Sequence, residues 1–239
     1  MDANTKTNTH WIDITADDGG HFKAYLATPP AGRGPGILLI QEIFGVNAHI
    51  RAVAEQYAMD GYTVLAPDVF WRQQSGVELG YDEADFGRAM GLMQAADFPQ
   101  VVADLAVVLK VLRGRPECNG RAAVMGYCMG GRLSYHVAAA TDVDAAVCYY
   151  GGGIPTVLDQ ASLIRAPILF HFAEKDGFIP MEGVEQVRRT FGGRDNARVE
   201  VYAGVDHGFN CWARGSYDQT AAALARGRTL VFLTTHLPD

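Results

Sequence analysis

The chain alternates short apolar runs with amphipathic stretches over most of its length. The run 36–40, Gly-Ile-Leu-Leu-Ile, has no polar position, which is typical of a strand buried on both faces. Further along, apolar side chains recur at helical spacing from Ile50 to Ala58, and Asp60-Gly61 ends that pattern. Strands that are followed by helices in this order predict parallel β-α-β units with right-handed crossovers.

The same alternation continues toward the C-terminus. Apolar runs predict five more strands, at 62–66, 122–125, 145–150, 167–172 and 198–202. Periodic apolar positions predict four more helices, at 98–112, 129–140, 180–191 and 218–235. Between them, 68–80 has no clear periodicity and 81–97 is helical in pattern. These two segments are the candidates for a cap over a site.

The N-terminal part predicts a β-hairpin. Segments 10–14 and 21–27 flank Asp17-Asp18-Gly19-Gly20, a strong turn signal. We expect this hairpin to form the antiparallel edge of an otherwise parallel sheet of about eight strands, with helices on both faces. The composition shows no boundary, so we expect residues 1–239 to form a single domain of this α/β class.

Composition and charge exclude several classes of protein. Apolar residues make up 49% of the chain and charged residues 20%, as in folded globular proteins. The 20 Lys and Arg against 27 Asp and Glu give a net charge of -7, which disfavours nucleic acid as a partner. No apolar run approaches the roughly 20 residues of a membrane span, and residues 1–10 lack a signal-peptide pattern. We expect a cytoplasmic protein without a membrane partner, either monomer or dimer.

One short motif carries chemistry. Gly126-Tyr127-Cys128-Met129-Gly130 lies between a predicted strand and a predicted helix. The two glycines leave room for a sharp turn that lifts the central side chain above the sheet. The first amides of the helix then face the same point and stabilise an anion. The motif predicts that Cys128 is a nucleophile; the alternative is a buried structural cysteine in a glycine-rich turn. The remaining cysteines lack this context and are expected to pack in the core: Cys118, Cys148 and Cys211.

A thiol nucleophile needs a general base, and the base needs a carboxylate to orient it. For this kind of turn the chain order is nucleophile, acid, histidine. Asp176 follows strand 167–172 and His207 follows strand 198–202, at the sheet edge where ligands bind. We therefore predict Asp176 as the acid and His207 as the base. Other choices stay open, namely Glu174 or Asp206 as the carboxylate and His136 or His171 as the histidine.

Several segments together resemble the dienelactone hydrolase (carboxymethylenebutenolidase) family of the α/β-hydrolase fold, over nearly the whole chain. They are Gln41-Glu42-Ile43-Phe44-Gly45, Ala66-Pro67-Asp68, Gly126-Tyr127-Cys128-Met129-Gly130-Gly131, Tyr149-Tyr150-Gly151, Glu174-Lys175-Asp176 and Asp206-His207-Gly208-Phe209. A cysteine in the turn combined with the Q-E-I-F-G segment is specific, since most α/β-hydrolases carry serine and lack that glutamate.

The resemblance implies a role for each of these residues. Cys128, Asp176 and His207 would form the catalytic triad, and Glu42 would hold the resting thiol and take its proton. The amides of Ile43 and Met129 would form the oxyanion hole. From the residues alone, Glu42 follows an apolar strand and a carboxylate can accept a thiol proton; the alternative is a solvated loop charge. The resemblance also places four residues around the substrate: Phe44, Phe86, Tyr150 and Cys211.

One departure concerns the substrate. In the family's pattern two arginines hold the carboxylate of the substrate, and the matching positions here are Phe86 and Cys211. Arg72, Arg88 and Arg214 lie nearby in sequence. We therefore expect a pocket that selects anionic lactones less strongly. A neutral ester or lactone is as good a candidate as dienelactone itself.

The leading hypothesis is a cysteine hydrolase that opens a lactone or cleaves a small ester through an acyl-enzyme. We expect no cofactor and no metal, since the sequence has no H-E-x-x-H, no P-loop and no dinucleotide fingerprint. Two other classes stay open. One is a non-catalytic binding protein with the same fold, and the other is a redox sensor built on Cys128, which would need a resolving thiol.

Overall fold

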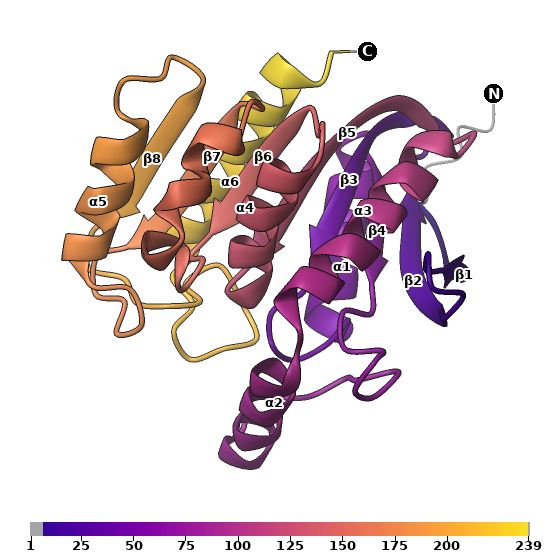
Figure 1. Cartoon of the computed structure of the whole chain (residues 1–239), viewed down its shortest axis with the longest axis horizontal. Helices are drawn as coiled ribbons and strands as arrows, with labels where there is room; N and C mark the ends of the chain where they lie inside the picture. Colours follow the sequence, from indigo (N-terminus) through magenta and orange to yellow (C-terminus); the bar gives the residue numbers. More distant parts are fainter. Residues whose placement is uncertain (1–6, 239) are drawn as a thin grey trace.

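The computed structural model describes residues 7–238, which form one sheet flanked by helices (Figure 1). The described strands are β1 (Asn8–Thr15), β2 (His21–Thr28), β3 (Gly34–Ile40), β4 (Thr63–Pro67), β5 (Cys118–Tyr127), β6 (Ala145–Tyr149), β7 (Ile168–Ala173) and β8 (Ala197–Tyr202). Their order across the sheet is β1-β2-β4-β3-β5-β6-β7-β8. Both β1 and β2 pair antiparallel, and every pairing from β4 to β8 is parallel. The predicted sheet, including its antiparallel edge, is confirmed.

The described part of the chain contains six α-helices, and most of them pack on the faces of the sheet. They are α1 (Ala48–Met59), α2 (Glu83–Ala95), α3 (Phe98–Gly114), α4 (Met129–Ala140), α5 (Met181–Phe191) and α6 (Gln219–His236). Figure 1 shows α3, α4 and α5 in front of the sheet and α6 behind it, while α2 projects past the end of the sheet. None of the helices in residues 7–238 combines the length and hydropathy needed to span a bilayer.

Side chains in the sequence set where most of these helices begin. A carboxylate or amide oxygen accepts a hydrogen bond from a backbone N–H of the first turn in α1, α2, α3 and α6. These capping residues are Asn47, Asp82, Asp97 and Asp218. In α4 the corresponding position is Cys128, which makes no side-chain capping bond. Its thiol therefore remains available for other contacts.

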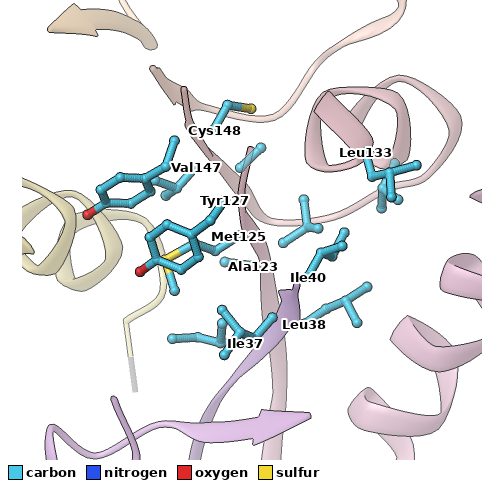
Figure 2. Close-up of a cluster of buried hydrophobic side chains, with 14 of the residues drawn as sticks. Ile37, Leu38, Ile40, Ala123, Met125, Tyr127, Leu133, Val147 and Cys148 are labelled. Carbon is cyan, nitrogen blue, oxygen red and sulfur yellow. The ribbon is translucent and has the colours of Figure 1, made fainter. Parts of the chain in front are cut away.

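The core lies at the centre of the sheet. Every residue of β3 and β6 is buried, and the second half of β5 is equally inaccessible. Figure 2 shows how these strands pack, with Leu133 of α4 on one side of β5 and Tyr127 pointing to the other. Burial on both faces explains why these strands are continuous apolar runs rather than alternating ones.

The structure differs from the predicted elements in two places. Strand β5 begins at Cys118 rather than near 122, because Cys118 pairs with Gly34 across a β-bulge. Two short 3₁₀ helices, η1 (Ile154–Thr156) and η2 (Leu158–Leu163), follow β6 where no element was predicted. Segments this short show no measurable hydrophobic period.

Candidate active site

The turn between β5 and α4 holds Cys128 in a strained conformation. Its φ of 55° and ψ of −117° are rare for a residue with a side chain. The flanking glycines make the turn possible. A Cβ on Gly126 would lie 2.3 Å from the carbonyl oxygen of Gly130, and one on Gly130 would lie 2.3 Å from that of Ile40. The backbones of β3, β5 and α4 thus approach at distances that only glycine permits.

The loops after β7 and β8 bring Asp176 and His207 together. His207 Nδ1 lies 2.8 Å from Asp176 Oδ2, and both side chains are buried. Asp176 Oδ1 accepts hydrogen bonds from the backbone N–H groups of Phe178 and Ile179. These bonds fix the carboxylate, which in turn fixes the imidazole ring. The Phe178 ring also packs against the imidazole in a T-shaped contact, with 5.0 Å between the ring centroids, and restricts its movement.

The charge on His207 depends on Cys128. Burial opposes a positive imidazole, but the Cys128 sulfur, through its charge and a hydrogen bond, and the Asp176 carboxylate outweigh it and raise the pKa of His207 to about 10. Cys128, His207 and Asp176 therefore form one continuous chain of interacting groups. This raised pKa favours a protonated imidazole beside the Cys128 sulfur.

The alternative acids and histidines have other partners. Glu174 accepts a hydrogen bond from the backbone of Gly204, and Asp206 accepts one from the backbone N–H of His207. His171 is enclosed between Tyr202 and Thr229, and burial lowers its pKa to about 3. His136 contacts Gln160 on the outer side of α4. The structure therefore brings only Asp176 of these carboxylates, and only His207 of these histidines, to Cys128 within residues 7–238.

Glu42 lies at the carboxyl end of β3 and is 1% exposed. Its Oε1 accepts from Arg214 Nη1 at 3.2 Å, and the Cys211 thiol gives it a second hydrogen bond. Its Oε2 has no hydrogen-bond partner in the described structure. Burial raises the pKa of Glu42 against the opposing charges of Arg214 and His207. The expected hydrogen bond from the Cys128 thiol to Glu42 is not among the contacts of the described residues.

A cavity of about 270 Å³ opens at Cys128 and His207. Three helices supply its apolar wall, and loops after β3, β6, β7 and β8 complete it. The lining side chains from α2 and the start of α3 are Phe86, Met90, Met93 and Phe98. Helix α2 is therefore the cap over the cavity, whereas no described residue of 68–80 lines it.

The four residues expected around the substrate divide into two pairs. Phe44 and Phe86 line the cavity, and their ring centroids lie 6.4 Å apart. Tyr150 and Cys211 are fully buried and are not among the described residues that line it. Tyr150 packs behind His207, with ring centroids 5.0 Å apart. These two residues support the site from behind its wall.

The two amides expected to stabilise an oxyanion belong to residues that line this cavity, Ile43 and Met129. Met129 is the first residue of α4, so its N–H has no acceptor within the helix. The helix dipole adds partial positive charge at the same point. No group of three or more His, Cys, Asp or Glu residues suited to a metal ion occurs in residues 7–238.

Of the three arginines that the sequence suggested, one lines the cavity. Arg72 binds Asp18 and Asp104 away from the cavity, and Arg88 contacts Gln74 at the surface. Arg214 does line the cavity, paired with Glu42. Arg132 also lines the cavity and was not among the residues predicted from the sequence. The available signal was its position, one helical turn after Cys128 on the same helix.

The fold and the cysteine–histidine–aspartate arrangement at the carboxyl edge of the sheet define an α/β-hydrolase. The model of the dienelactone hydrolase family matches residues 22–237, and the chain belongs to that family. Carboxymethylenebutenolidases of Pseudomonas putida and Pseudomonas sp. (strain P51) are 36% and 34% identical to it. These alignments cover 94% and 96% of this chain and 96% and 97% of the relatives.

Comparison with solved structures agrees with the family. A protein assigned as a dienelactone hydrolase from Klebsiella pneumoniae subsp. pneumoniae superimposes with a TM-score of 0.82 and 29% identity. The match covers 95% of this chain and 99% of that protein. The chain is thus a hydrolase of lactones or carboxylic esters, of the dienelactone hydrolase type.

Proposed function

We propose that Cys128 is the nucleophile of this hydrolase and that the reaction passes through an acyl-enzyme. The observation that carries the proposal is the continuous contact from Cys128 through His207 to Asp176, with Cys128 raised on a strained turn. A protonated imidazole beside sulfur stabilises a thiolate, which is the reactive form. The substrate is a small ester or lactone whose carbonyl reaches Cys128 through the apolar cavity.

Glu42 is the group that we propose accepts the thiol proton. Its Oε2 is unpartnered among the described residues, and burial raises the pKa of the carboxyl toward the protonated form. Transfer of the proton to Glu42 leaves a thiolate beside protonated His207. The ion pair between Arg214 and Glu42 Oε1 holds the carboxylate in place for this step.

The thiolate then attacks the carbonyl carbon and forms a C–S bond, and the carbonyl electron pair moves to oxygen. The amides of Ile43 and Met129 stabilise that oxyanion. On collapse the C–O bond of the ester breaks, and His207 gives its proton to the departing oxygen. In a lactone that oxygen stays attached to the acyl group.

Deacylation reverses the roles. Neutral His207 takes a proton from water, and the resulting hydroxide attacks the thioester carbonyl. The C–S bond breaks, the thiolate returns beside protonated His207, and the carboxylic acid leaves. Glu42 then gives its proton back to the thiolate, which restores the resting thiol. Throughout, Asp176 holds the imidazole with Nδ1 facing the carboxylate.

The nucleophile is tested with Cys128→Ala on 4-nitrophenyl acetate. We expect hydrolysis to fall by at least about 10³-fold, with the same melting temperature as the wild type. Cys128→Ser should retain little activity, because the site is arranged to activate a thiol rather than a hydroxyl. Mass spectrometry of quenched wild-type reactions should find the acetyl group on the peptide that contains Cys128.

The matched control is Cys148→Ala, since Cys148 is a buried core thiol on β6. That variant should lose stability but keep its rate per folded molecule. Hydrolysis near the wild-type rate in Cys128→Ala, or an acetyl group on another cysteine, would refute the assignment.

A further inference from the structure

Arg132 is a cationic group in the wall of the active-site cavity. It lies on α4, one turn after Cys128, and its backbone N–H donates to the Cys128 carbonyl oxygen at 3.2 Å. Cys128 precedes α4 and Arg132 lies in its first turn, and both residues line the cavity. The proposed nucleophile and the cation therefore face the same space.

The guanidinium of Arg132 packs against an aromatic ring and lies close to bare backbone. Its Cζ lies over the Phe98 ring at 5.0 Å from the centroid. A Cβ added to Gly153 would lie 2.7 Å from Arg132 Nη1. Gly153 has φ of 85°, a conformation that favours glycine. Arg132 Nε donates a hydrogen bond to His136 Nε2 at 3.4 Å, which further restrains the guanidinium.

Arg132 is half-buried, and no carboxylate of residues 7–238 lies within ion-pair distance of it. Arg214, the other arginine of the cavity, is already bound to Glu42. The facing walls are aromatic rings and methionines of α2 and α3. A pre-positioned cation in an apolar cavity is a recognition site for an anion, since a charged hydrogen bond there meets little competition from water.

We propose that Arg132 binds a carboxylate on the substrate, remote from the carbonyl that Cys128 attacks, and thereby selects anionic esters or lactones. The proposal rests on the proposed function of Cys128. It reverses the expectation drawn from Phe86 and Cys211, because the cation stands on the nucleophile's own helix instead. The planar guanidinium matches a carboxylate with two parallel hydrogen bonds.

Two esters with acyl chains of equal length test the proposal: mono-4-nitrophenyl glutarate, which carries a carboxylate, and neutral 4-nitrophenyl pentanoate. The readout is the ratio of their kcat/KM values. In Arg132→Met we expect this ratio to fall about 10- to 100-fold, the size of a lost charge-assisted bond. Arg132→Lys should fall between the two, as a point charge without the planar fork.

Arg88→Met is the matched control, since Arg88 lies on the surface of α2 and contacts Gln74. It should leave the ratio as in the wild type. The proposal is overturned if Arg132→Met slows both esters equally, which indicates a structural role. It is also overturned if the ratio falls in Arg214→Met but not in Arg132→Met.

A failure of the proposed role of Cys128 can be distinguished from a failure of the proposed role of Arg132. If the wild type cleaves neither ester, the proposed role of Cys128 is wrong, and a measurement of ligand binding then tests Arg132. Calorimetry should show tighter binding of 3-phenylpropanoate than of its amide to the wild type, and Arg132→Met should lose that difference. Equal binding of anion and amide to the wild type would overturn the proposal independently of any turnover.

Discussion

At His207 the direction of one hydrogen bond decides what the ring can do. Asp176 Oδ2 holds Nδ1, so Nε2 is the nitrogen left for Cys128 and the substrate. The two backbone N–H groups on Asp176 Oδ1 keep the carboxylate from turning away. The role that we propose for the imidazole therefore depends on a buried carboxylate that does not line the cavity.

This dependence predicts the effect of Asp176→Asn. An amide keeps the shape of the side chain but favours the wrong imidazole tautomer, and comparable triads lose on the order of 10³–10⁴ in kcat. KM should change little, because the interaction acts in the transition state. The measurement is steady-state hydrolysis of 4-nitrophenyl acetate.

Asp206→Asn is its control, because among the described residues the Asp206 carboxylate accepts only from the backbone N–H of His207. We expect a change in kcat of less than about threefold, since the amide oxygen of asparagine can still accept that hydrogen bond. A loss in Asp206→Asn as large as that in Asp176→Asn would contradict the assignment of Asp176 as the carboxylate that orients His207.

Some of these residues could be predicted from the sequence and others could not, for physical reasons. Cys128, Asp176 and His207 follow strand ends, and local glycine patterns or chain order mark such positions. The pair of Glu42 and Arg214 joins positions 172 residues apart through the folding of a long loop, which no local pattern encodes. Arg132 was predictable as a neighbour of the site, because it lies in the first turn of the helix that begins directly after Cys128.

At the scale of elements, the crossing of β3, β5 and α4 sets the position of Cys128. Gly126 and Gly130 lie where the three backbones come closest. A side chain here has only carbonyl groups to displace, and a backbone yields far less than a flexible side chain. The site geometry is thus a property of the packing of these three elements.

We therefore expect Gly130→Ala to destabilise the fold by roughly 3 kcal/mol or more, as overpacking against backbone does. Its Cβ would lie 2.3 Å from the Ile40 oxygen and 2.5 Å from that of Gln41. The measurement is the free energy of unfolding in urea, with activity per folded molecule as a second readout.

Gly87→Ala in α2 gives the opposite expectation. No atom lies within 4 Å of a Cβ placed there, and alanine in a helix interior is favoured by about 1 kcal/mol. This variant should be slightly more stable than the wild type. Equal stability of Gly130→Ala and the wild type would mean that the three elements can separate without cost.

The elements themselves were largely predictable, and their exceptions are instructive. Continuous apolar runs predicted the buried strands, and helical spacing predicted α1 and α3 to α6. The 3₁₀ helices η1 and η2 were not predicted, because they occupy only 154–156 and 158–163 and are too short to show a hydrophobic period. The extra residues of β5 are set by pairing with β3, which is information from another part of the chain.

At the scale of the molecule, two structural layers have separate tasks. The sheet and its flanking helices hold the reacting groups, and α2 beyond the sheet edge closes the cavity above them (Figure 1). Only Ala89 of α2 is fully buried, and its other apolar side chains, such as Phe86 and Met90, pack against the core while partly exposed. Substrate selectivity can therefore change through α2 without disturbing the core.

The core contains a group that links global stability to pH. His171 on β7 lies between the Tyr202 hydroxyl at 2.8 Å and Thr229 Oγ1 at 2.9 Å, and so joins β7, β8 and α6. Burial lowers the pKa of His171 to about 3, against roughly 6.5 in an unfolded chain. Below pH 6.5 the unfolded state therefore binds a proton that the folded state does not.

Stability from this group is complete above pH 6.5 and is lost as the pH falls toward 3. The loss is roughly 1.4 kcal/mol per pH unit, so roughly 2–3 kcal/mol between pH 6.5 and 4.5.

His171→Gln removes the titration and should cost about 1–3 kcal/mol at pH 7 through its unpaired neighbours. The stability advantage of the wild type should then nearly vanish at pH 4.5. Urea unfolding of both proteins at the two pH values measures this, with His21→Gln on the exposed face of β2 as the control. An advantage that stays constant with pH would show that His171 is not held neutral in the fold.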